Sequence, residues 1–301
     1  MIAAIGSVRV VKSDACHLGR YVEPESAELA YVDPPFSVGV AFGARTKKSE
    51  VRARSNEASG PVAYDDKWES LGDYLAWLEI RLRAIWQLLA PTGTMWLHLD
   101  YRAVHEAKLL CDTVCGRSRA IGEVIWSPGN GAKSRNGPGI THQTLLLYAK
   151  SDEFIWNRND VMLREPFAET SLAMHFKHRD DQGRAFRERV VNGKAYRYFA
   201  DEGRAIGSIW ADCPAMIANT PIHSEATGYP TQKPLKLLER IVRASSSPGG
   251  LVIDPFCGSG TTLHAAAVAG RRAVGCDIGA LAIETTTNRL RKAGIPPHPL
   301  R

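Results

Sequence analysis

Hydrophobic positions along the chain form short apolar runs that alternate with segments of helical spacing. Short apolar runs between turn residues are typical of buried strands, whereas apolar residues spaced by three and four are typical of helices. Strands are predicted at 7–11, 29–32, 94–99, 121–126, 144–148, 251–253 and 273–276. Helices are predicted at 71–89, before about 115, at 235–246, after the turn at 254–262, and up to about 292. This alternation predicts an open α/β sheet.

The clearest helix is the one at 71–89, because its apolar residues all fall on one face. Ser70 and Asp73 have the spacing of a capping box, in which side chains satisfy free N–H groups at the start of a helix. Pro91 and Gly93 are expected to end this helix. The next strand is then expected to begin at Thr94.

Two segments show neither the apolar runs of strands nor the helical spacing of apolar residues. The first, 37–67, is polar and contains Arg45, Lys47 and Lys48, and it is predicted to be a long mobile loop. The second, 157–208, is rich in arginine, lysine and aromatic residues, and it is predicted to be an inserted module. The predicted organisation is a first part at 1–156, the insertion at 157–208 and a last part at 209–301.

Composition limits the class of protein. A chain of 301 residues, 44% of them hydrophobic, can form one large domain with an insertion. Its net charge of +6 suits a polyanionic partner. The six cysteines are scattered without paired CxxC motifs, so we predict no metal site and a reducing, cytoplasmic location. No apolar stretch reaches the roughly 18 residues of a membrane span, and we expect no secretory leader.

A glycine-rich turn follows the strand predicted at 251–253. Gly258 and Gly260 precede a helix there, and such a turn brings backbone N–H groups and the positive end of the helix dipole close to a ligand. Asp277 ends the next strand, where a carboxylate can accept hydrogen bonds from ribose hydroxyls. These residues alone predict a nucleotide-like cofactor in a Rossmann-type sheet. A tight turn that binds nothing is the alternative.

The sequence Asp33-Pro34-Pro35-Phe36 ends the strand predicted at 29–32. Two prolines fix an extended backbone, so the Asp33 carboxylate and the Pro34 carbonyl can form a rigid pair of acceptors for a planar NH₂ group. The Phe36 ring can stack on a base. A proline-rich turn without chemistry explains these four residues equally well when they are taken alone.

In this order, the motifs resemble those of the β-class amino-methylating DNA methyltransferases, in which the catalytic motif precedes the cofactor motif. The matching segments are Ala30-Tyr31-Val32-Asp33-Pro34-Pro35-Phe36, Gly228-Tyr229-Pro230-Thr231-Gln232-Lys233-Pro234 and Asp254-Pro255-Phe256-Cys257-Gly258-Ser259-Gly260-Thr261-Thr262. Ser13-Asp14-Ala15 stands where this family usually has Gly-Asp. The resemblance extends over most of the chain except about 37–67 and 157–208. It implies a Rossmann-like, circularly permuted S-adenosylmethionine methyltransferase sheet with an inserted target-recognition region.

The resemblance also assigns roles to residues. It implies that Asp33, Pro34, Pro35 and Phe36 catalyse methyl transfer from S-adenosylmethionine to adenine N6 of a base flipped out of DNA. The implied cofactor-binding residues are Asp14, Ala15, Lys233, Asp254, Pro255, Phe256, Cys257, Gly258, Ser259, Gly260, Thr261, Thr262 and Asp277. Among them, Asp14 would face the cofactor adenine and Lys233 its carboxylate. An ordinary surface lysine at a helix start is the alternative for Lys233.

Two departures from the family pattern lie next to these motifs. Ser37 stands where the family often has asparagine, and Ser13 stands where glycine is more usual. The extra C-terminal DNA-binding domain of some relatives is not expected here, so DNA contacts are expected from the loop and the insertion. The residues predicted for them, mostly as phosphate contacts, are Arg45, Lys47, Lys48, Lys177, Arg179, Arg187 and Arg197. A solvated charged surface is the alternative.

The resemblance implies double-stranded DNA as the partner and a prokaryotic or phage setting, and it leaves open a homodimer and a cognate restriction endonuclease. Asp-Pro-Pro-aromatic is commoner among adenine enzymes, and Ser-Pro-Pro-Tyr among cytosine-N4 enzymes. A cytosine-N4 DNA methyltransferase is therefore the first alternative. An enzyme acting on RNA or on a protein amide, and a non-catalytic nucleic-acid-binding relative, are the others. Such a non-catalytic relative would be expected to lack Asp33 or the glycines, and this chain has them.

Overall fold

The structure is a computed structural model that describes residues 6–37, 39, 41–43, 62–129, 134–216 and 224–298. Its chain forms two compact units, the first made of Met1–Trp156 with Ser208–Arg301 and the second of Asn157–Gly207. Three of the basic residues predicted to contact DNA, Arg45, Lys47 and Lys48, lie outside the described residues.

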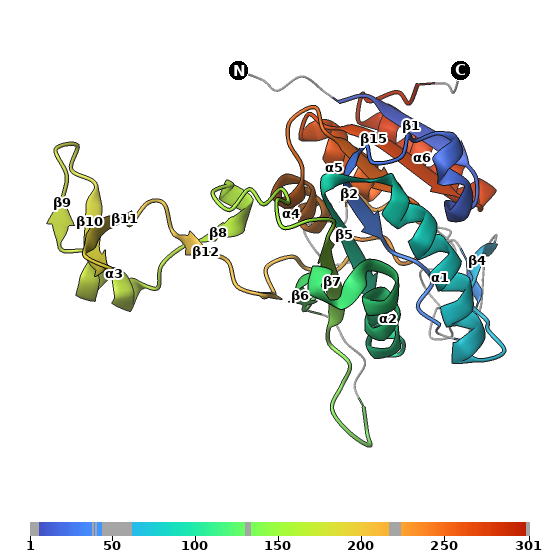
Figure 1. The fold of residues 1–301 in the computed structure, drawn as a ribbon, viewed down its shortest axis with the longest axis horizontal. Coiled ribbons are helices and arrows are strands. Elements are labelled where there is room, and N and C mark those ends of the chain that lie inside the picture. Colours follow the sequence, from blue (N-terminus) through green and yellow to red (C-terminus); the bar gives the residue numbers. More distant parts are fainter. Residues whose placement is uncertain are drawn as a thin grey trace. The chain divides into compact units, whose positions relative to one another are not determined.

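The first unit is built on one mixed eight-stranded sheet (Figure 1). Along the sheet, the strands are β1 (Val8–Lys12), β15 (Arg272–Asp277), β14 (Leu251–Asp254), β2 (Ala27–Val32), β5 (Leu89–Leu99), β7 (Gln143–Ala149), β6 (Ala120–Trp126) and β13 (Ile209–Trp210). Neighbouring strands are parallel from β1 to β5 and between β6 and β13, whereas β7 is antiparallel to β5 and β6. The predicted α/β sheet is confirmed.

Strands β14 and β2 are distant in sequence and adjacent in the sheet. They run parallel, and Ile253 pairs with Ala30. Because parallel neighbours end at the same edge, the turn after Asp254 and the turn after Val32 lie side by side. This edge of an open α/β sheet is where ligands bind.

Helices cover the two faces of this sheet. On one face, α1 (Leu71–Leu88) packs Tyr74, Leu78 and Leu82 into a core with alternate strand residues such as Val32 and Leu97. On the other face, Trp96 of β5 donates its indole N–H to Ser245 of α4 at 3.0 Å. The remaining helices are α2 (Val104–Cys111), α4 (Leu235–Ser245), α5 (Thr261–Val268) and α6 (Ala280–Lys292), and a 3₁₀ turn spans Ala15–Arg20.

The predicted capping box at the start of α1 is confirmed. The Ser70 hydroxyl accepts the Asp73 backbone N–H at 3.1 Å and donates to the Asp73 carboxylate at 2.6 Å. The helix ends at Leu88, one residue before its predicted end. The predicted start of the next strand at Thr94 is wrong, because β5 begins at Leu89 and includes Pro91 and Gly93. A Cβ on Gly93 would lie 2.6 Å from the Ala27 carbonyl oxygen, so the glycine here permits two strands to approach closely.

Two further expectations need correction. The helix expected up to residue 115 ends at Cys111 and continues as a π-helical turn over Asp112–Gly116. Gly116 has a φ of 96°, which closes that turn. The segment predicted as a long loop contains two short strands, β3 (Ala41–Gly43) and β4 (Val62–Asp65), which pair antiparallel. Strands of three and four residues are too short for alternation to be recognised.

The second unit is ordered where the sequence pattern predicted only an insertion. It contains α3 (Glu169–His175) and a three-stranded sheet of β9 (His178–Arg179), β10 (Ala185–Val191) and β11 (Lys194–Phe199). A second small sheet pairs β8 (Arg164–Glu165) with β12 (Arg204–Ala205), after a 3₁₀ turn at Val161–Leu163. Asn192 and Gly193, with φ values of 50° and 74°, form the turn between β10 and β11.

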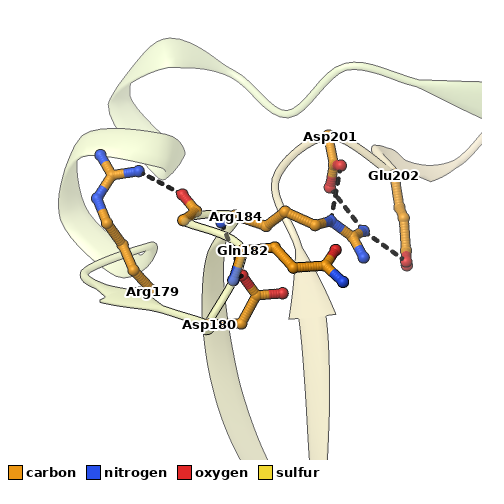
Figure 2. A network of polar contacts seen from close by, with 7 residues as sticks. Arg179, Asp180, Gln182, Arg184, Asp201 and Glu202 are labelled. Atoms are coloured by element: carbon orange, nitrogen blue, oxygen red, sulfur yellow. Dashed lines mark hydrogen bonds and ion pairs between the residues drawn. The ribbon is translucent and has the colours of Figure 1, made fainter.

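Polar contacts hold the base of this β10–β11 hairpin (Figure 2). The Arg184 guanidinium binds Asp201 at 2.9 and 3.0 Å and Glu202 at 3.1 Å. The Asp180 carboxylate accepts the backbone N–H of Arg184 at 2.8 Å and of Gln182 at 3.0 Å. These contacts tie the strand entering the hairpin to the segment leaving it.

Within the described part of the chain, no helix is both long and apolar enough to cross a membrane.

Candidate functional site

A cavity of about 420 Å³ opens where β14, β2 and β15 end. Its size lies within the usual range of small-molecule sites, about 300–1,000 Å³. The predicted catalytic and cofactor-binding residues line it, with the exception of Gly260. The structure therefore brings together two motifs that are more than 200 positions apart in the sequence.

The turn after β14, residues 254–262, is called the cofactor turn below. Its backbone is held from within and by the adjacent strand, since Cys257 N–H donates to the Cys276 carbonyl at 2.9 Å and Gly260 N–H to the Cys257 carbonyl at 2.6 Å. Gly258 and Gly260 have φ values of 47° and 75°, in the region that favours glycine. These glycines let the chain turn sharply into α5.

The two glycines of the cofactor turn have different surroundings. Gly258 faces the cavity, as predicted for a close approach to a ligand. Gly260 faces α6 instead, and a Cβ there would lie 2.7 Å from Cγ2 of Thr286. The glycine at 260 is therefore needed for helix packing behind the turn.

Two carboxylates lie on either side of the cofactor turn. Asp277 accepts the N–H of Gly258 at 3.0 Å and of Gly279 at 2.8 Å. Burial raises the pKa of Asp277, and these N–H groups oppose the rise. Asp254 is buried, and its pKa is raised to about 7, first by burial and also by the charges of Asp33 and Asp277, while hydrogen bonds from Thr262 and Phe256 act against the rise.

Asp14 lies across the cavity, at the start of the 3₁₀ turn. Its carboxylate accepts the N–H of Cys16 at 3.0 Å and makes an ion pair with Arg81 of α1. Burial acts to raise the pKa of Asp14, but the Cys16 amide and Arg81 outweigh it, so the pKa is lowered. Arg81 also lies over the Trp77 ring at 4.0 Å. Arg81 and Trp77 line the cavity and were not singled out from the sequence.

The turn after β2, residues 33–37, is called the catalytic turn below, after its predicted role. Asp33 at its start binds the Lys233 ammonium through its two oxygens, at 2.7 and 2.6 Å. Burial raises the pKa of Asp33, and the positive charge of Lys233 opposes this rise. Lys233 is 7% exposed and lies 4.9 Å from the Phe36 ring centre. The observed partner of Lys233 is thus Asp33, a contact that the sequence did not predict.

A second carboxylate, Asp66, holds the other end of the catalytic turn. It is 0% exposed and accepts the backbone N–H groups of Phe36 at 3.1 Å and Ser37 at 2.9 Å. The indole N–H of Trp68 donates to it at 2.9 Å. Sequence analysis missed Asp66 because it lies in the segment interpreted as an unpatterned loop.

Aromatic rings lie behind the catalytic turn. The His98 ring lies 5.9 Å from Phe36 and 5.5 Å from Trp126, between centres. His98 Nδ1 and the Tyr31 hydroxyl are 2.7 Å apart. Burial, together with the charge of Lys233, lowers the pKa of His98 well below its usual value, so the ring is neutral. His98 is fully buried and supports Phe36 from inside the fold.

The four described basic residues predicted to contact DNA lie in the second unit, and their surroundings differ. Lys177 and Arg179 are exposed, and Arg179 donates to the Gly183 carbonyl at 2.8 Å (Figure 2). Arg187 lies over the rings of Phe167, Phe176 and Tyr198 at 5.3 to 5.5 Å. Arg197 makes an ion pair with Glu188 at 2.9 Å.

The chemistry of the cavity fits S-adenosylmethionine. Asp277 lines the cavity beside Gly258, and its carboxylate oxygens can accept hydrogen bonds from ribose hydroxyls. The rings of Phe256 and Trp77, 5.8 Å apart, and the 65% exposed Ile278 give an apolar wall suited to a purine. Together, the fold and the cavity define a Rossmann-like α/β protein with a cavity suited to a nucleotide-like cofactor.

Comparison with known proteins identifies the family. Residues 27–288 match the family model for N6/N4 DNA methylases, described as DNA methylase, and the chain belongs to this family. It is 30% identical to the type II methyltransferase M.EcaI of Enterobacter cloacae over 89% of this chain and 65% of that protein, so it spans less than two thirds of that relative. It is 25% identical to the DNA adenine methyltransferase YhdJ of Escherichia coli (strain K12), over 93% of this chain and 82% of that protein.

Solved structures agree on the fold. PvuII DNA methyltransferase, described as cytosine-N4-specific, superposes with a TM-score of 0.60 at 14% identity, over 95% of this chain and 87% of that one. Other solved neighbours were determined as complexes with S-adenosylmethionine.

Proposed function

We propose that this protein is a site-specific DNA methyltransferase that transfers a methyl group from S-adenosylmethionine to adenine N6. The observation that carries the proposal is the shared cavity, which is lined by Asp33 and Pro34 of the catalytic turn and by the cofactor turn. An acceptor pair for an amino group and a site for a nucleotide-like cofactor thus share one space. Family membership supports the same reaction class.

The residues of the cavity would divide the work of catalysis. An exocyclic amine is a poor nucleophile because its lone pair is delocalised into the base. The Asp33 carboxylate and the Pro34 carbonyl would accept hydrogen bonds from the two N–H groups of the amine. They would thereby stabilise the positive charge that develops on its nitrogen. Phe36 stacks on the flipped base. The cofactor supplies a methyl group already activated by a sulfonium, so alignment is the main requirement that remains.

Lys233 has an electrostatic role in this scheme. The Asp33 side chain is only 18% exposed, and this partial burial alone would favour its neutral, protonated form, which is a weaker acceptor. The Lys233 ammonium at 2.6 Å favours the carboxylate form that the reaction needs. The contacts of Lys233 thus support a role at Asp33 in addition to the cofactor carboxylate contact that the family resemblance implies.

Adenine is the proposed base because the catalytic turn has aspartate at its first position, as is commoner among adenine enzymes. The relative named as a DNA adenine methyltransferase supports this choice. Cytosine N4 is the second candidate, favoured by the fold shared with a cytosine-N4-specific enzyme. The acceptor pair serves either amino group by the same chemistry.

We propose the second unit as the region that recognises duplex DNA. Lys177 and Arg179 are its best candidates for phosphate contacts because they are exposed. Arg197 is a weaker candidate, since Glu188 neutralises its charge, and Arg187 packs against aromatic rings. Arg189 and Lys194 are exposed on the β10–β11 hairpin and are further candidates for phosphate contacts.

The proposed setting is the prokaryotic or phage-infected cytoplasm, with a homodimer and a restriction partner left open.

The test is methyl transfer from labelled S-adenosylmethionine to mixed-sequence duplex DNA, followed by nucleoside mass spectrometry. The wild type should form N6-methyladenine, and Asp33→Ala should reduce the rate by about 10²–10³-fold or more. Calorimetric titration should show that the variant still binds the cofactor. Asp152→Ala, which removes a 96% exposed aspartate side chain, is the matched control and should be fully active.

Each other outcome has a clear meaning. N4-methylcytosine would retain the acceptor mechanism and change the base. Cofactor binding without label in DNA would contradict the proposed substrate, and RNA would then be assayed. An active Asp33→Ala variant would refute the role of Asp33.

A further inference from the structure

The catalytic turn has few backbone hydrogen-bond donors, because two of its residues are prolines. Proline has no backbone N–H, so neither Pro34 nor Pro35 can be held in place by donating a hydrogen bond. The first backbone donors after Asp33 are the N–H groups of Phe36 and Ser37. The position of the Pro34 carbonyl therefore depends on whatever accepts those two groups.

One side chain accepts the two N–H groups. Asp66 Oδ2 lies 3.1 Å from Phe36 N, and Asp66 Oδ1 lies 2.9 Å from Ser37 N. Hydrogen bonds from a backbone N–H to a carboxylate are stronger than those between neutral groups. The catalytic turn is thus fastened at its far end by a residue 30 positions away in the sequence.

Asp66 is itself fixed in position. It is fully buried, and the Trp68 indole N–H donates to its Oδ1 at 2.9 Å. Its backbone carbonyl accepts the Gly39 N–H at 3.0 Å. Trp68 packs against the Tyr74 and Trp77 rings of α1, at 5.3 and 5.0 Å between centres. The anchor is therefore tied to a rigid helix.

The backbone at Ser37 needs such an anchor. Its φ is 59°, in the left-handed region, which is unfavourable for an L-residue. A residue in that region persists where its surroundings hold it. The hydrogen bond from Ser37 N–H to Asp66 holds the backbone at this residue, and it therefore fixes the direction in which the chain continues after the turn.

We propose that Asp66 is the positioning residue of the catalytic turn. By holding Phe36 N–H and Ser37 N–H, it fixes the direction of the Pro34 carbonyl and the orientation of the Phe36 ring. Asp66 acts through this backbone, and Asp33 remains the catalytic residue. The kinetic part of this inference rests on the proposed function, whereas the anchoring itself does not.

The test is Asp66→Asn, which preserves side-chain volume but replaces one acceptor oxygen by an NH₂ group. A donor then faces a donor, and one of the two backbone bonds is lost. Amide hydrogen exchange at Phe36 and Ser37, followed by NMR, should become faster. The kcat for methyl transfer should fall about 10²-fold, the size expected for a misplacement of about 1 Å, with the KM for S-adenosylmethionine changing little.

Asp73→Asn is the matched control. It makes the same chemical change seven positions along the chain, at the exposed N-terminus of α1, where Asp73 accepts the Ser70 hydroxyl. It should lower Tm slightly and leave the exchange at Phe36 and Ser37, and the kcat, unchanged. A general loss of stability would affect the two variants alike, whereas loss of the anchor affects Asp66→Asn alone.

Trp68→Phe is the second variant, for use if Asp66→Asn fails to fold. It keeps an aromatic ring, smaller than the indole, and removes the indole N–H bond to Asp66 while the two backbone bonds to Asp66 can remain, so exchange and kcat should change in the same direction by a smaller factor. Wild-type exchange at Phe36 and Ser37 in the tested variant would overturn the proposal. Faster exchange with wild-type kcat would overturn its kinetic part. A wild type inactive on DNA would refute the proposed function, and exchange would still decide the anchoring.

Discussion

The cofactor turn and the catalytic turn meet in one cavity and are held in different ways. The cofactor turn is held by its own glycines and by the adjacent strand β15, through bonds such as Cys257 N–H to the Cys276 carbonyl. The catalytic turn is rigid through its prolines but depends on Asp66 and Lys233 from distant segments. The conformation of the cofactor turn thus follows largely from its own residues. The catalytic turn also needs contacts with distant side chains, which cannot be recognised from the local sequence.

The largest effect that tests this difference is expected from Lys233→Gln. Removing one partner of a buried ion pair costs about 3–5 kcal/mol, because the other charge remains buried. The pKa of Asp33 should rise further, since Lys233 opposes the rise caused by burial. The reactive carboxylate exists above its pKa, so the acidic limb of the kcat–pH profile should move to higher pH.

Lys236→Gln is the control for that change. Lys236 pairs with Asp212 at 2.8 Å, but its side chain is 47% exposed, and such surface pairs contribute about 1 kcal/mol or less. Its pH profile should match the wild type. An unshifted acidic limb in Lys233→Gln would mean that Lys233 does not set the charge of Asp33.

The next effect concerns the cofactor turn and is expected from Gly260→Ala. Its new Cβ would meet Thr286 at 2.7 Å, and its φ of 75° disfavours alanine. Together, these should lower the free energy of unfolding by about 2–4 kcal/mol and weaken cofactor binding. Gly294→Ala has a similar φ of 73° but no atom within 4 Å of the new Cβ. Chemical denaturation of the two variants separates the clash from the backbone cost, and equal losses would contradict the packing role.

The smallest effect should come from Ser37→Gly in the catalytic turn. Glycine removes the cost of the left-handed φ but makes the unfolded chain more flexible, so Tm should change little and the free energy of unfolding by less than about 1 kcal/mol. Ser37→Val should destabilise clearly, because a β-branched residue is poorly accommodated there. A large stabilisation by glycine would mean that Asp66 does not hold this position.

Local patterns predicted the parts of the fold that local physics determines. The strand–turn–helix around the cofactor turn and the capping box at Ser70 were predicted because their signals lie within a few residues. The start of β5 at Leu89 was missed, since a proline and a glycine normally end structure, and only the pairing with Ala27 shows why they are tolerated. The Asn192-Gly193 turn was a usable signal for the hairpin in the second unit and was overlooked.

The two motifs of the site were predicted, but the side chains that hold the turn at 33–37 were not. No sequence pattern connects Asp33 to Lys233, or Phe36 to Asp66, because these contacts arise only when the sheet and α1 bring distant segments together. The structure explains which backbone conformation is required at position 37, where this chain has serine and the family often has asparagine. Asparagine tolerates a positive φ better than most residues, and Ser37 adopts one with Asp66 as its partner.

The attachment of the insertion has a consequence for how such proteins diversify. Trp156, just before the insertion, and Trp210, just after it, pack against the same buried indole of Trp96, at 6.4 and 5.8 Å between ring centres. The two ends of the inserted chain are thus joined through one side chain of the sheet. Replacing residues 157–207 by a segment from another protein would leave this aromatic joint intact. Such an exchange would change the second unit and leave the sheet that carries the proposed methyl-transfer site in place.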